Sequence, residues 1–239
     1  VPGAPVADVL VTPETEEARP TADRLNELIR RSQEILSTHP VNLKRVAQGK
    51  YPANSIWPWS PGYKPDMQPI SENFPIRHGS VISAVDLIFG IGHYAGLEPI
   101  HVEGATGLYD TNYEGKAQAA IKSLRDGADF VFLHVEASDE AGHEGNVDLK
   151  VRTIEYLDRR LLAPIFSAAA SLDEPLTIAV LPDHPTPCHL LTHTADAVPF
   201  LIYRPGETPD AVTEFSERSA RDGSYGTISG TEFMRLLIK

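Results

Sequence analysis

Two segments of the sequence carry aspartate and histidine side chains at spacings that could hold metal ions. Asp139 and His143 lie four residues apart, so in a helical turn both would project from one face and grip a single ion. Asp183 and His184 are adjacent, and His193 follows a few residues later. Carboxylate and imidazole ligands together suit Mn²⁺ or Zn²⁺, whereas sites built only of oxygen favour Mg²⁺ or Ca²⁺. These residue types therefore predict a divalent-metal centre.

Each segment directly follows an apolar run that is typical of a buried strand. Residues 128–135 precede the Asp139 segment, and residues 176–181 precede Asp183. In parallel α/β sheets, ligands bind beyond the carboxyl ends of the strands. A lone Asp-x-x-x-His is explained as well by a salt bridge, and a lone Asp-His by a capping aspartate with a packed histidine. Two such motifs after consecutive strands favour metal binding over coincidence.

Other polar residues near these motifs have simpler explanations. Cys188, the single cysteine, could be a thiolate ligand, but a small packed residue beside the site is the preferred interpretation. The loop Gly104–Gly107 could offer N–H groups to a phosphate, but it lacks the lysine and the spacing of a P-loop. Asp110 and Lys116 could contact a substrate, and surface positions would explain them equally well.

The elements that must position these residues alternate between strands and helices. Apolar and amphipathic runs predict strands at residues 97–102, 128–135, 176–181 and 198–203, and helices at residues 80–94, 113–126, 149–167 and 230–237. Gly96 is well placed to end the helix at residues 80–94. This alternation favours an α/β fold with a mostly parallel sheet and helices on both faces.

The first part of the chain has a different character. Residues 1–20 are rich in Pro, Thr and Glu, and an extended strand followed by a loop is expected there. A helix is predicted at residues 21–37, with Thr21 as its N-cap and Pro40 ending the run. A short strand at residues 54–59 should then lead into a Pro/Gly loop at residues 60–62, and such a junction indicates a domain boundary.

Composition excludes some classes of partner. The net charge of −12 argues against nucleic acid, because contacts to a phosphate backbone need a basic patch. No apolar run approaches the ~18 residues of a membrane span, so no membrane partner is expected. A single cysteine cannot form an intrachain disulfide and suits a reducing cytosol, so a cytoplasmic location is expected.

In combination, several motifs resemble the archaeal-type, cofactor-independent phosphoglycerate mutases of the alkaline phosphatase superfamily. The resemblance is strong over residues 79–239 and loose over residues 20–60. The motifs that carry it are Gly90–Gly96, Gly104–Gly107, Asp110–Tyr113, His134–Ala137, Asp139–His143, Pro182–Pro187, His193–Thr194 and Val198–Pro199.

The resemblance implies a metal-dependent phosphotransferase that interconverts 2- and 3-phosphoglycerate, a small phosphorylated substrate, through a phosphoserine intermediate. It implies two divalent ions, with Mn²⁺ preferred and Zn²⁺ or Mg²⁺ as alternatives. By motif position, Asp139, His143 and His193 would hold one ion, and Asp183 and His184 would hold the second. One ion would activate the serine, and both would neutralise the phosphoryl oxygens.

The sequence departs from the family in one respect, because nothing in it matches the family's first strand with its acidic metal ligand and serine nucleophile. Ser60 stands where the family ordinarily has a loop glycine. The resemblance therefore implies the carboxy-terminal portion only. Residues 1–50 would be the remnant of a substrate-covering domain, and residues 51–239 a metal-binding core that lacks its first strand. An exposed sheet edge could then mediate oligomers.

Two other functions stay open on the sequence. A kinase of the same superfamily that acts on homoserine would use the same metal ligands, since the acceptor is gripped mainly by the covering domain. A non-catalytic, metal-stabilised module that binds a partner would fit the unmatched serine, although the intact ligand set opposes it.

Overall fold

The structure is a computed structural model that describes residues 5–58 and 62–238. The chain divides into two units, Val1–Lys64 and Pro65–Lys239. The loop expected at residues 60–62 and the end of the strand expected at residues 54–59 fall largely outside the described residues. Within the described ranges, no helix is both long and apolar enough to cross a membrane.

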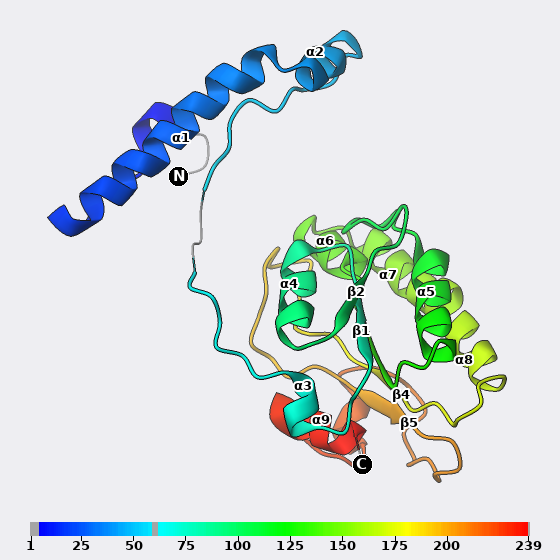
Figure 1. The fold of residues 1–239 in the computed structure, drawn as a ribbon. Coiled ribbons are helices and arrows are strands. Elements are labelled where there is room, and N and C mark those ends of the chain that lie inside the picture. The colour runs from blue at the N-terminus through cyan, green and yellow to red at the C-terminus, as the bar shows by residue number, and fades with distance from the viewer. Residues whose placement is uncertain (1–4, 59–61, 239) are drawn as a thin grey trace. The chain divides into compact units, whose positions relative to one another are not determined.

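The first unit is built on a long amphipathic helix, α1 (Arg19–Thr38), which is followed by α2 (Pro40–Ala47) (Figure 1). Asn42 of α2 fastens the extended segment that follows, because its amide donates to Ala53 O at 2.7 Å and its Oδ1 accepts from Ala53 N at 3.0 Å. Residues 54–58 form no strand, contrary to expectation. Ile56 N donates to Oγ of Ser32 in α1 at 2.9 Å, and the segment lacks a partner strand among the described residues.

Two further expectations for this unit are wrong. Residues 5–20 form the short 3-10 helices η1 (Val6–Val9) and η2 (Glu16–Ala18) in place of a strand. The α1 helix already begins at Arg19, so Thr21 lies inside it and is not its N-cap. α1 does end at Thr38, two residues before Pro40, as expected. Pro40 itself opens α2, because a proline is well tolerated in the first turn of a helix.

The second unit contains the elements that carry the predicted metal ligands. In chain order these are α3 (Ile70–Asn73), β1 (Gly79–Ile82), α4 (Asp86–Tyr94), β2 (Glu98–Ile100), α5 (Tyr113–Arg125), β3 (Phe130–Leu133), α6 (Ala137–His143), α7 (Val147–Tyr156), the π-helical η3 (Leu157–Leu162), α8 (Ala163–Ala169), β4 (Ile178–Val180), β5 (Leu201–Tyr203), the 3-10 helix η4 (Ser219–Asp222) and α9 (Gly230–Leu237). Every strand and helix expected between residues 97 and 237 is present, with some ends shifted by one to three residues.

A parallel three-stranded sheet in the order β2-β1-β3 forms the centre of this unit. Val81 and Ile82 of β1 are fully buried, and Val81 is in register with Pro99 on one side and Phe132 on the other. The helix α4 packs on β1 and β2, whereas α5 packs on β1 and β3, so helices cover both faces of the sheet (Figure 1). The expected α/β fold with a parallel sheet is confirmed for these three strands.

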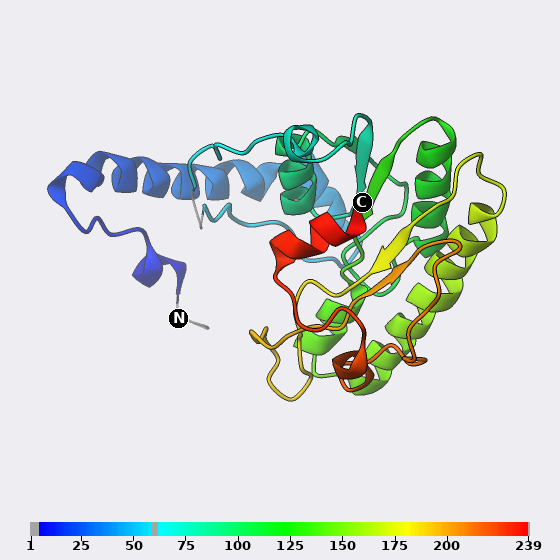
Figure 2. The same ribbon diagram turned by 90° about the horizontal axis from the view of Figure 1, so that it is seen from below.

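The last two strands correct the expectation of a single, mostly parallel sheet. β4 and β5 pair antiparallel with each other, and neither joins the parallel sheet within the described residues. Figure 2 shows the two strands as neighbouring yellow and orange arrows. Tyr203 of β5 meets Phe166 of α8 edge to face at 5.4 Å, and Phe200 meets Phe233 of α9 at 5.5 Å. β3 and β4 therefore each keep one unpaired edge in the described part of the chain.

Residues 80–94 divide into β1 and α4, where a single helix was expected. A short apolar run cannot be assigned to strand or helix by periodicity alone. Here the β-branched Val81 and Ile82 occupy the middle of the sheet, where such side chains pack well. Gly96 ends α4 as expected, with a φ of 81° that places it in the left-handed region.

The contact between α4 and β1 yields a prediction on stability. A Cβ on Gly92 would lie 2.9 Å from Cβ of Val81, whereas a Cβ on Gly90 of the same helix would meet nothing within 4 Å. We predict that Gly92→Ala lowers the free energy of unfolding by about 1–3 kcal/mol through overpacking. Gly90→Ala should raise it by up to about 1 kcal/mol through helix propensity. Urea unfolding followed by circular dichroism tests the pair, and equal effects would contradict this packing.

Candidate metal centre

The turn from β3 into α6 positions the first two predicted ligands. α6 begins at Ala137, directly after the end of β3, and Asp139 N donates to Glu136 O at 2.8 Å in its first turn. Asp139 and His143 consequently lie on one face of α6, as their spacing predicted. Gly145 then adopts a φ of 67°, which lets the chain turn sharply into α7.

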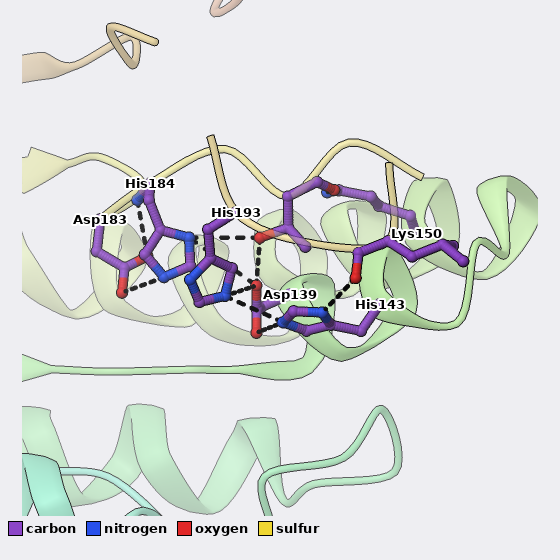
Figure 3. A network of polar contacts seen from close by, with 8 residues as sticks. Asp139, His143, Lys150, Asp183, His184 and His193 are labelled. Atoms are coloured by element: carbon purple, nitrogen blue, oxygen red, sulfur yellow. Dashed lines mark hydrogen bonds and ion pairs between the residues drawn. The ribbon is translucent and has the colours of Figure 1, made fainter. Parts of the chain in front are cut away.

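The loop after β4 packs closely against α6 and brings His193 to it. A Cβ on Gly142 would collide with the carbonyl oxygen of Thr186, so only glycine allows this approach. Lys150 of α7 donates from Nζ to the same carbonyl at 2.6 Å. Figure 3 shows that the side chains from α6 and from the loop point toward one another. The approach of the loop to α6 thus joins two segments that are far apart in the sequence.

Asp139, His143 and His193 form a compact triangle of ligand atoms. The two histidine Nε2 atoms lie 3.0 Å apart, His143 Nε2 lies 3.3 Å from Asp139 Oδ2, and His193 Nε2 lies 3.4 Å from Asp139 Oδ1. Ligands bound about 2.0–2.2 Å from a tetrahedral ion lie about 3.3–3.6 Å from one another. The two distances to Asp139 fall in this range, and the two Nε2 atoms are slightly closer, so the rings would separate a little around a bound ion. The three residues thus form a candidate site for one divalent ion.

Neighbouring groups orient two of the three ligands, His143 and Asp139. Nδ1 of His143 lies 3.0 Å from Leu191 O, and donation from Nδ1 to this carbonyl leaves Nε2 as the free ligand atom. Thr186 bonds Asp139 Oδ1 through its hydroxyl, and the same hydroxyl lies 3.3 Å from His184 Nδ1. A metal-ligating histidine or carboxylate almost always has such an outer partner. This shell supports the metal interpretation independently of the triangle.

Asp183 and His184, the predicted ligands of a second ion, lie beside the triangle. His184 Nε2 is 3.4 Å from Asp183 Oδ2, and His184 Nδ1 is 4.0 Å from Asp139 Oδ1. The ring of His184 stacks on that of His193 with centroids 3.7 Å apart. All five predicted metal residues thus gather at one place (Figure 3). Asp183 and His184 supply two ligand atoms, fewer than a closed site requires.

The structure also decides the open questions on other residues. Among the described residues, two groups of side chains could hold an ion: the triangle, and a group of carboxylates formed by Glu136, Asp139 and Glu140. Cys188 is in neither group, which agrees with a packed role. Asp110 is an exposed residue that accepts a bond from Thr106 Oγ1 at 3.2 Å. Lys116 is 1% exposed, so a surface position is wrong for it, and its Nζ donates to His134 O at 3.0 Å.

The buried charges beneath the centre shift one another's pKa values. Burial lowers the pKa of Lys116 to about 8, against the attraction of Glu136. Burial and the charges of Glu140 and Asp139 raise the pKa of Glu136, while Lys116 opposes this shift. The carboxylate of Glu136 also covers Gly107, where a Cβ would lie 2.8 Å from Oε2. The Gly104–Gly107 loop therefore packs on this carboxylate.

The sequence motifs did not identify Thr186 or Lys150 as members of this site. Thr186 lies in the motif Pro182–Pro187, which could have suggested a supporting role beside Asp183. No sequence motif indicates a role for Lys150, because that role depends on α7 lying beside the carbonyl of Thr186. Such contacts between distant segments cannot be seen in local spacing.

Comparison with known proteins shows the family of the chain. The family model of the Metalloenzyme superfamily matches residues 7–239. A 2,3-bisphosphoglycerate-independent phosphoglycerate mutase of Methanosarcina barkeri is 51% identical over 218 residues, which cover 91% of this chain and 54% of that protein. A probable mutase of the same name from Geobacter sulfurreducens is 46% identical over 91% of this chain and 54% of its own length. The chain thus spans about half the length of the curated relatives it matches.

Solved structures support the same assignment. A protein from Pyrococcus horikoshii, 34% identical, superposes with a TM-score of 0.78 over 93% of this chain and 57% of its own. A cofactor-independent phosphoglycerate mutase from Thermoplasma acidophilum, 27% identical, superposes with a TM-score of 0.56 over 95% of this chain and 54% of its own. The chain therefore belongs to the Metalloenzyme superfamily and is related within it to the archaeal-type 2,3-bisphosphoglycerate-independent phosphoglycerate mutases.

Proposed function

We propose that this chain supplies the metal-binding part of a phosphotransferase that interconverts 2- and 3-phosphoglycerate. The observation that carries the proposal is the triangle of Asp139, His143 and His193, whose ligand atoms lie 3.0–3.4 Å apart. The reaction is inferred from the relatives, because two phosphoglycerate mutases that are 51% and 52% identical to this chain match 91% and 90% of its length.

The residues have separate roles in this proposal. Asp139, His143 and His193 hold one divalent ion, and Asp183 and His184 contribute to a second. Mixed carboxylate and imidazole ligands suit Mn²⁺ or Zn²⁺, and the resemblance to the mutase family favours Mn²⁺. When bound, two such ions supply positive charge that neutralises phosphoryl oxygens during in-line transfer. Thr186 orients the carboxylate of Asp139, and Lys150 fixes the loop that carries Thr186.

The remaining parts of the proposed machinery lie outside these residues. A serine nucleophile that forms the phosphoserine intermediate, and further ligands of the second ion, would come from the part of the relatives that this chain does not cover. The unpaired edges of β3 and β4 are consistent with a core that takes another strand, or that pairs with a second molecule. In the same proposal, residues 1–50 belong to a substrate-covering domain and residues 51–239 to the metal-binding core.

The triangle leads to a prediction on metal affinity. We expect His193→Ala to weaken Mn²⁺ binding at least about 10-fold, because even the loss of an outer-shell partner costs that much. His189 lies in the same loop, is exposed, and is outside both groups of potential ligands, so His189→Ala is the matched control. Isothermal titration with Mn²⁺ measures both variants. Equal affinity of the two variants would refute this site.

A second prediction concerns turnover. Because a phosphoserine mechanism passes both half-reactions through one nucleophile, the 239-residue chain alone should convert 3- to 2-phosphoglycerate no faster than background. The measurement is product formation in the presence of Mn²⁺, with the full-length Methanosarcina barkeri mutase assayed in parallel as a positive control. Robust conversion by the isolated chain would show that it contains its own nucleophile and would overturn this part of the proposal.

A further inference from the structure

His134 lies at the carboxyl edge of the sheet, on the segment between β3 and α6 that leads to Asp139, and has no role in the function proposed above. It follows the last residue of β3, and its backbone N–H donates to Ile82 O at 2.8 Å, at the end of β1. Its carbonyl accepts from Nζ of the buried Lys116 at 3.0 Å. The backbone of His134 is thus fixed from two sides, at the carboxyl edge of the sheet where the metal residues gather.

The ring of His134 is fixed as well. Its Nδ1 lies 3.2 Å from Oγ of Ser83, a residue that is 1% exposed. The same Oγ accepts from Val85 N at 3.1 Å, so its own proton must go to another acceptor. Among the described residues, Nδ1 of His134 is the acceptor within reach. The hydroxyl of Ser83 therefore donates to Nδ1, and the neutral ring carries its proton on Nε2.

The Nε2 atom of His134 is available to bind a ligand. Within residues 5–58 and 62–238, Nε2 makes no hydrogen bond. Every buried side-chain nitrogen or oxygen in these ranges does have a hydrogen-bond partner, so Nε2 is not a buried atom. Nε2 therefore retains contact with solvent. Burial lowers the pKa of His134, and the charges that act on the ring are those of Asp183, Lys116, Asp139 and His184. Three of these four neighbours are predicted metal residues, and His134 follows β3 at the carboxyl edge of the sheet, so the ring lies close enough to the centre to interact with its charges.

We propose that His134 is a further substrate-binding residue, whose Nε2–H donates a hydrogen bond to an oxygen of the phosphoryl group held at the metal centre. The inference rests on the proposed function, since it requires a phosphorylated ligand there. A protonated Nε2 cannot coordinate a metal ion, which separates His134 from His143 and His193. It can donate to an anion, and a donor held in place in advance binds an oxyanion without a cost of reorganisation.

Two substitutions distinguish the roles of Nδ1 and Nε2 of His134. His134→Asn places an amide near the position of Nδ1 and can keep the contact to Ser83, but it removes the donor at Nε2. His134→Gln can place its amide N–H near the position of Nε2. The proposal expects His134→Asn to bind inorganic phosphate about 10-fold more weakly in the presence of Mn²⁺, and His134→Gln to recover part of that loss. Mn²⁺ affinity itself should stay unchanged in both variants.

The experiment is isothermal titration of the 239-residue chain with Mn²⁺ and then with inorganic phosphate. Thermal unfolding of each variant controls for folding. A second readout needs neither metal nor activity: in ¹⁵N-histidine NMR spectra of the metal-free chain, His134 should be the Nε2–H tautomer. In Ser83→Ala, the Nδ1–H tautomer should become populated, because Nδ1 loses its donor.

The outcomes distinguish this inference from the proposed function. If the wild-type chain binds Mn²⁺ but not phosphate, the proposed function is refuted, because its ligand does not bind. This inference is then refuted as well. If the wild type binds phosphate and His134→Asn binds it equally well, the inference alone is overturned. A wild-type spectrum of His134 in the Nδ1–H tautomer would overturn it too. Equal losses of Mn²⁺ and phosphate affinity would show that His134 acts on the metal ligands, and would also overturn it.

Discussion

The close approach of the loop after β4 to helix α6 is the constraint on which the rest of the site depends. Gly142 has no side chain at the point where the carbonyl of Thr186 meets the helix, and Lys150 binds that same carbonyl from α7. If the loop were displaced by the size of one methyl group, His193 would leave the triangle and Thr186 would leave Asp139. The direct contact between the backbone at Gly142 and the backbone at Thr186 therefore sets the distances among the candidate metal ligands.

The strands make this contact possible, because the segment that contains α6 and the loop after β4 both follow the carboxyl ends of strands. β3 is followed by α6, β1 ends at Ile82 just before Ser83, and β4 is followed by the loop with Asp183. Polar side chains from three chain segments therefore follow strand ends. Parallel strands expose their carboxyl ends together, which is why α/β proteins so often bind ligands there. In this chain the parallel sheet supplies two of the three segments, and the antiparallel pair β4–β5 supplies the third.

The candidate ligands could be predicted from the sequence because their signals are local. Asp139 and His143 need only a helical turn, and Asp183 and His184 need only a strand end. The supporting residues could not, because Thr186, Lys150 and Lys116 act through contacts between segments 18 to 47 residues apart. The strand β1 was missed for a related reason: its apolar run continues into α4, and only the pairing with β2 and β3 defines it as a strand.

The balance of charge explains how so acidic a chain could attract a phosphorylated ligand. Among the five candidate ligands only Asp139 and Asp183 bear negative charge, and the three histidines are neutral when they coordinate a metal. Two divalent ions would therefore leave the centre with a net positive charge, although the chain as a whole carries −12. Lys116 adds a cation beneath the same edge while it is protonated, and its burial keeps this charge from being screened by solvent. Anions would thus be attracted to this one place on a surface that otherwise repels them.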